Sequence, residues 1–160
     1  MATATRTEER LAQYAFIVRD LSGGLETDWR EANVPRVTWE LGMDREGGAQ
    51  FAKKEVTIAD VDNFTLSRGL IPSKTSLWDW VTASGSYVAG MPYGKGIASP
   101  DHLRNLVIDQ LRRDRTVAVS VKCFNCQVVS WGPGGFDNMS SDLQVESAEI
   151  ACEGLHVVYY

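Results

Sequence analysis

The chain has 160 residues, of which 44% are hydrophobic and 23% are charged, and this composition predicts a folded protein rather than a disordered one. Its length fits a single domain over residues 1–160 with a sizeable hydrophobic core. The net charge of −5 argues against a general nucleic-acid-binding surface, because such surfaces neutralise phosphates with Lys and Arg. Neither a membrane-spanning apolar run nor a signal-peptide core is visible, so we expect a cytoplasmic protein whose monomer does not insert into membranes.

The first part of the chain favours short β-strands. Residues 1–12 are polar and lack alternation, which predicts a flexible N-terminal arm. Val37, Trp39 and Leu41 alternate with polar residues, so this strand is expected to turn one face inward and the other toward water. A stretch with two adjacent glycines then predicts a loop. The strands expected here are residues 14–19, 37–41, 55–58 and 64–67, and the loop is residues 42–48.

A short helix is expected at residues 76–83. Leu77, Trp80 and Val81 fall on one helical face, and Ser84-Gly85 ends the pattern. Trp78 lies two positions from Trp80, so both cannot face the same core. We expect one of the two indoles to meet another subunit, because aromatic side chains are favoured at interface cores. The alternative is a partly exposed tryptophan packed beneath a loop.

The second half begins with a long loop at residues 84–100, which contains four glycines and two prolines. Local spacing of Leu103, Leu106, Val107 and Leu111 favours a helix after it. Residues 117–129 alternate at first and then lose their parity, which predicts a long strand bent by a β-bulge. Two final strands are expected within residues 143–152 and 155–160.

Residues able to support catalysis are few and do not form a known motif. Cys123 and Cys126 lack the second Cys/His pair of a zinc site, and three-residue spacing in a strand should point them to opposite faces. We interpret these cysteines and Cys152 as reduced core residues without a disulfide. His102 and His156 have no neighbouring nucleophile pattern. The sequence therefore predicts a non-enzyme with no metal and no cofactor.

Several short strings, in order, resemble the tail-tube family of contractile-tailed phages and related extracellular injection systems. They are Arg45-Glu-Gly-Gly48, Phe64-Thr-Leu-Ser-Arg-Gly69, Leu77-Trp-Asp-Trp80, Phe124-Asn125, Gly132-Pro133, Glu146 and Cys152-Glu-Gly-Leu155. The resemblance covers roughly residues 13–157. The chain departs from the family pattern at Asp114-Arg115, where Asp-Gly is usual, and at Cys126-Gln-Val128, where Trp-Pro is frequent.

This resemblance implies a mainly β fold in which two packed antiparallel sheets form a small barrel or sandwich with one flanking α-helix. It makes residues 105–111 a strand, against their local helical pattern, and leaves a short turn at 99–103. It also implies stacked hexameric rings around a channel. The implied partners are other copies of the chain, a sheath protein, baseplate or spike and tube-terminating proteins, and cargo, a tape-measure protein or DNA in the lumen. The particle is then a phage tail or a tail-like device, released or anchored.

Contacts between subunits are expected at two places. Arg45, Glu46, Gly47 and Gly48 are assigned to a loop that contacts the next ring. Arg68, Gly69, Trp78 and Trp80 are placed near a subunit boundary. The alternative function is a monomeric small-ligand-binding β-barrel, whose tryptophans would line an apolar cavity. The two hypotheses differ in the size of the particle that the protein forms.

Overall fold

The computed structural model describes residues 10–90, 92 and 94–160, so most of the arm expected at 1–12 lies outside the described residues. One helix, α1 (Ser76–Ser84), interrupts a succession of strands. The strands are β1 (Phe16–Asp20), β2 (Glu31–Ala32), β3 (Val37–Asp44), β4 (Lys53–Val61), β5 (Phe64–Gly69), β6 (Arg104–Leu111), β7 (Val117–Pro133), β8 (Val145–Ala151) and β9 (Gly154–Tyr159). The expected fold class is confirmed: mainly β, with antiparallel sheets and one flanking helix.

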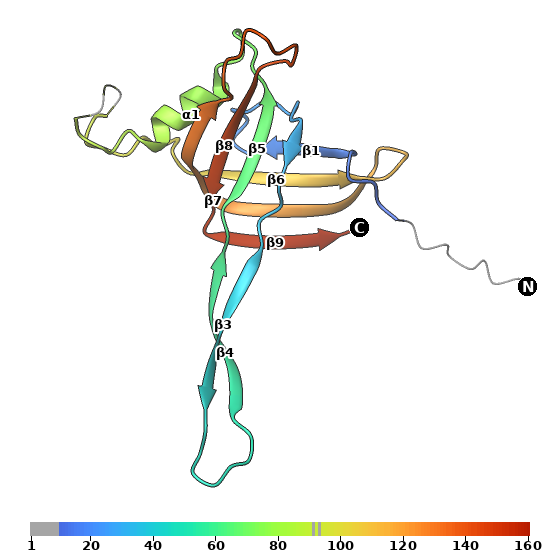
Figure 1. Cartoon of the computed structure of the whole chain (residues 1–160), viewed down its shortest axis with the longest axis vertical. Coiled ribbons are helices and arrows are strands. Elements are labelled where there is room, and N and C mark those ends of the chain that lie inside the picture. Colours follow the sequence, from blue (N-terminus) through green and yellow to red (C-terminus); the bar gives the residue numbers. More distant parts are fainter. Residues whose placement is uncertain (1–9, 91, 93) are drawn as a thin grey trace, which may run out of the picture.

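The long strand β7 belongs to two sheets (Figure 1). Its first half pairs with β6 on one side and β9 on the other, and β6 in turn pairs with β1; these strands form the first sheet. Its second half pairs with β8, β8 pairs with β5, and β5 pairs with β2; these strands form the second sheet. All of these pairings are antiparallel. The two halves of one strand therefore hold the two sheets against each other.

The bend between the halves of β7 lies at Asn125, whose φ of 51° is in the left-handed region. Phe124 is the last β7 residue paired with β9, and Gln127 is the first paired with β8. Asn tolerates this conformation better than most residues with a side chain. The bend turns both Cys123 and Cys126 into the same core, so the expectation that they face opposite sides is wrong. The predicted irregularity of this strand is confirmed.

Residues 104–111 form strand β6, as the family resemblance implied, and their local helical pattern is misleading. Four consecutive residues, Leu106 to Asp109, are buried, so both faces of this strand are covered. A strand covered on both faces loses its two-residue alternation, and its apolar residues then also match a helical spacing. These residues form a strand rather than a helix because they pair with β1 on one side and with β7 on the other.

Helix α1 closes one side of the core. Leu77 and Trp80 are completely buried in the cluster that joins both sheets, and the Trp80 indole donates to the His102 carbonyl at 3.1 Å. The loop after the helix returns along it, because the Lys95 amide donates to the Ser86 carbonyl at 2.7 Å. The core is filled by side chains from β1, β5, β6, β7, β8 and α1.

A buried guanidinium ties the second sheet to the helix. Arg68 in β5 is 2% exposed and donates from Nε to Glu146 and from Nη1 to Glu26, at 2.5 and 2.6 Å. Its Nη2 donates to the Lys74 carbonyl at 3.1 Å, just before the helix, and its guanidinium lies over the Trp29 ring. Burial alone would lower the pKa of Arg68, but its hydrogen bonds with Glu146 and Glu26 raise that pKa overall, so the group stays charged.

Replacing Asn125 by Val should destabilise the subunit by about 1–3 kcal/mol, because a β-branched residue is strained at positive φ. Asn125→Gly should cost less than about 1 kcal/mol, since glycine adopts this conformation freely. Urea unfolding of both variants measures the difference. Equal stabilities would show that the bend does not depend on the left-handed residue.

Replacing Arg68 by Met should cost about 3–5 kcal/mol, because Glu146 would be left buried without its partner. Lys74→Met is the matched control: its ion pair with Asp28 is exposed, and its loss should cost at most about 1 kcal/mol. Denaturant unfolding gives both values. Adding Glu146→Gln to Arg68→Met should recover part of the loss, and no recovery would contradict this explanation.

Candidate assembly surfaces

The β3–β4 hairpin projects from the body of the subunit, beyond β9 (Figure 1). Its base is closed by a hydrogen bond from the Asp62 amide to the Arg36 carbonyl at 2.9 Å. Arg45, Glu46, Gly47 and Gly48 lie in the loop at its far end, and all four are exposed. The tip is shaped by a turn from Glu46 to Ala49 in which Gly48 has a φ of 90°. The loop assigned from the sequence to an inter-ring contact is thus the most distant part of a projecting arm.

One face of this hairpin is apolar and uncovered. Trp39, Leu41 and Met43 alternate along β3 and are 57%, 60% and 71% exposed, and Val56, paired with Leu41, is 62% exposed. The expectation that this strand turns a face inward is therefore wrong for the isolated subunit. The alternation is that of a half-buried strand, but the hairpin leaves the body before its apolar face can be covered. A contiguous exposed apolar surface of this kind marks an interaction site.

The first sheet has two open edges. In the described part of the chain, β1 pairs only with β6 and β9 pairs only with β7. Each edge therefore presents backbone donors and acceptors along a row, which is the arrangement to which another strand can be added. Sequence alternation could locate these strands, but it could not show which of them end the sheet.

The other four predicted contact residues have different surroundings. Arg68 and Trp80 are buried inside the subunit, where they hold the helix and sheet in place, so their side chains do not reach the surface. Gly69 lies at the exposed end of β5, opposite Val145. Trp78 is 42% exposed, and its ring lies 4.8 Å from that of Trp131. The prediction that the two helix tryptophans face different ways is confirmed.

Trp78 and Trp131 line a surface groove of about 540 Å³ between α1 and the second half of β7. Tyr87 and Val129 also line it, and both are exposed. The groove offers apolar and aromatic contact without a charged group in its lining. Such a surface suits another protein better than a polar small molecule.

The described residues contain no group of three His, Cys, Asp or Glu side chains arranged to hold a metal ion. The three cysteines are buried as free thiols in the core. The Cys126 thiol donates to Cys123 and Cys152, and these hydrogen bonds together with burial raise its pKa, whereas accepting hydrogen bonds lowers the pKa of Cys152. All three thiols lie inside the hydrophobic cluster, so they pack the core. Among the described helices, none has the length and apolarity needed to cross a membrane.

The fold is shared with chains of several solved structures. One is a chain of the sheath–tube complex of an extracellular contractile injection system, PVC, in the extended state, with a TM-score of 0.78 and 18% identity over 99% of this chain and 100% of that chain. Another belongs to the tube-terminating cap of the anti-feeding prophage, with a TM-score of 0.77 and 19% identity over 96% and 93%. Hcp1 from Flavobacterium johnsoniae is less similar, with a TM-score of 0.52 and 11% identity over 92% and 97%.

At these identities the structural likeness establishes the fold alone. No curated protein sequence matches the chain significantly. The family model described as T4-like virus tail tube protein gp19 matches residues 12–156, which is nearly the whole chain. The protein therefore belongs to the T4-like tail tube protein family and is a structural tube subunit rather than an enzyme.

Proposed function

We propose that this subunit builds the inner tube of a contractile injection system or phage tail, as hexameric rings stacked around a central channel. The observation that carries the proposal is a tail-tube fold whose projecting hairpin has an uncovered apolar face. The tube has a passive role: a contracting sheath drives it through a target envelope. This function needs no active site, only stable contacts between copies.

Rings are closed through the open edges of the first sheet. Because β1, β6, β7 and β9 alternate in direction, β1 and β9 run antiparallel to each other. A copy rotated about the ring axis can place its β1 beside the β9 of its neighbour in an antiparallel pair. The sheets then join into one large barrel, and closing a sheet in this way removes its exposed edges.

Stacking of the rings uses the hairpin. Arg45, Glu46, Gly47 and Gly48 reach farthest from the body and contact the next ring, while the apolar face along β3 is covered by neighbouring copies. Such a contact joins two different surfaces and does not close on itself, which is the requirement for an open filament. Gly69 and Trp78 lie at a second boundary, where Trp78 serves as an aromatic anchor.

The remaining partners follow from assembly into a contractile particle. The similar structures come from a sheath–tube complex, a tube-terminating cap and a baseplate, so we place sheath, terminating and baseplate or spike proteins in contact with this tube. Cargo, a tape-measure protein or DNA passes through the lumen. Assembly takes place in the cytoplasm, before the particle is released or anchored.

Negative-stain electron microscopy of the purified protein, alone and with the products of neighbouring genes, should show rings or tubes with a central hole. The physical reason is that open strand edges and an uncovered apolar hairpin favour association. A protein that stays monomeric under all of these conditions would favour the small-ligand-binding barrel instead.

Polar substitutions on the apolar face of the hairpin, Leu41→Gln with Val56→Thr, should abolish tubes while changing subunit stability by less than about 1 kcal/mol, since both side chains are exposed in the subunit. Thr38→Ser with Glu55→Gln, on the opposite face, is the control and should leave tubes intact. Glu46→Arg at the tip should permit rings but weaken their stacking. Micrographs and sedimentation distinguish these outcomes, and normal tubes from the Leu41/Val56 variant would refute the role of this face.

A further inference from the structure

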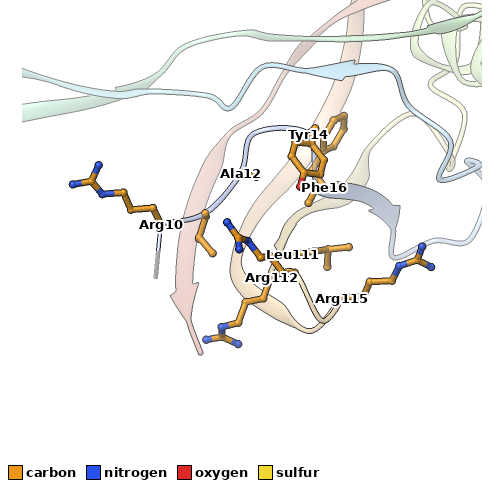
Figure 2. A pocket seen from close by; sticks show the side chains of 10 residues that line it. Arg10, Ala12, Tyr14, Phe16, Leu111, Arg112 and Arg115 are labelled. Carbon is orange, nitrogen blue, oxygen red and sulfur yellow. The ribbon is translucent and has the colours of Figure 1, made fainter. Parts of the chain in front are cut away.

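A basic pocket lies where the β6–β7 turn meets the segment before β1 (Figure 2). Its volume is about 550 Å³, large enough to hold one or two side chains of a partner. Tyr14, Phe16 and Leu111 supply apolar surface. The basic residues that line it are Arg10, Arg112, Arg113 and Arg115. Four arginines therefore line one pocket together with apolar residues, on a chain whose net charge is −5.

The four arginines do not have the same role. Arg112 is engaged within the subunit, because it donates to the Val117 and Tyr160 carbonyls at 3.0 and 2.6 Å. Arg10, Arg113 and Arg115 are exposed and form no ion pair with a carboxylate of the described residues. The nearby Asp114 accepts hydrogen bonds from Thr116 instead, at 2.7 and 2.9 Å. Three of the positive charges are thus available to an outside anion.

Arg115 has a φ of 65°, in the left-handed region, where glycine would fit without strain. A residue with a side chain costs roughly 1–2 kcal/mol in this conformation. The chain therefore carries an arginine at a position where stability favours glycine. Strain of this kind is found where a side chain is needed for function.

A matching surface lies elsewhere on the same chain, in the loop of residues 134–144 between β7 and β8. Phe136, Met139 and Leu143 are 84%, 93% and 88% exposed, the highest values among the large apolar residues apart from Phe51. Asp137 and Asp142 lie between them, and residues 134–144 contain no Lys or Arg. The loop combines an uncovered apolar surface with negative charge, which is the complement of the arginine pocket.

This loop is ordered by its own hydrogen bonds. The Gly134 amide donates to the Val145 carbonyl at 2.8 Å, and Gln144 Nε2 donates to the Gly134 carbonyl at 2.6 Å, so the base of the loop is closed. The Met139 amide donates to Asp137 Oδ1 at 2.9 Å and shapes the tip. A segment that is already ordered loses little conformational entropy when it binds.

We propose that loop 134–144 of one copy docks into the arginine pocket of a second copy. The apolar side chains of the loop cover Tyr14, Phe16 and Leu111, and Asp137 and Asp142 pair with Arg113, Arg115 and Arg10. The loop lies at the top of the body and the β6–β7 turn at its right side (Figure 1), so the contact joins unlike surfaces and can repeat from copy to copy. The inference rests on the proposed function, since it assigns one of the contacts between tube subunits.

Among possible occupants, a protein segment fits better than a nucleic acid. Arginines bind phosphates as well as carboxylates, and exposed aromatic residues can stack on bases. However, the chain is acidic overall, and it carries a segment of the required charge and apolarity itself. Nucleic-acid binding at this pocket is therefore treated as a competing outcome of the test.

The test is a charge exchange in the full chain. Arg113→Asp with Arg115→Asp reverses the pocket, and Asp137→Arg with Asp142→Arg reverses the loop. Each double variant should raise the subunit concentration needed for tube formation at least about tenfold, because like charges then face each other. The quadruple variant, with both surfaces reversed, should restore assembly to within about threefold of the unmodified protein. Arg30→Asp with Arg36→Asp, two exposed arginines outside the pocket, is the control and should assemble normally.

Assembly is followed by sedimentation and negative-stain microscopy, and thermal unfolding verifies that every variant is folded. If the unmodified protein forms tubes and the double variants do so equally well, this contact is overturned while the proposed function stands. If the unmodified protein forms neither rings nor tubes with its neighbours, the proposed function falls and this contact with it. Loss of single-stranded oligonucleotide binding in the pocket variant, with unchanged assembly, would instead assign the pocket to nucleic acid.

Discussion

The structure depends on a single backbone constraint, the bend that lets one strand serve two sheets. Around Asn125, β7 changes partners: its pairing with β9 ends at Phe124, its pairing with β6 ends at Cys126, and its pairing with β8 begins at Gln127. The bend places Cys123 and Cys126 in the same core, which contains side chains from both sheets. Without it, β7 would continue flat and the core between the sheets would not close.

The isolated subunit is an incomplete structure in physical terms. Its core is closed and its buried polar side chains are satisfied within the described residues, yet two sheet edges, an apolar hairpin face and an apolar acidic loop remain uncovered. A monomer with these features would be prone to aggregation. Under the proposed function, these same features are the contacts between copies of the subunit.

The charges of the subunit have two separate roles. Arg68 and Glu146 form a buried ion pair, in which each charge requires its partner because desolvation would otherwise be costly, and the partly exposed Glu26 adds a second carboxylate. Arg10, Arg113 and Arg115 form no ion pair among the described residues and face outward, where they are available to a partner. Arg68 was expected from the sequence near a subunit boundary, but its buried side chain stabilises the subunit from inside. Residue type alone does not distinguish these roles, because an arginine serves either one.

Sequence alone determined the class of fold, the positions of most strands and the helix, and the family. Alternation in β3 and β5, the spacing of Leu77 and Trp80, and the glycine-containing loops are local properties, so they could be predicted from neighbouring residues. Only the tertiary structure decided which faces of these elements are covered. Strand β6 is buried on both faces, whereas Trp39 and Leu41 are exposed. Arg68 and Trp80 lie inside the subunit. These outcomes depend on which strands meet across long stretches of chain and on the left-handed bend at Asn125. Local patterns specify that a face is apolar, whereas only the packed chain specifies what covers it.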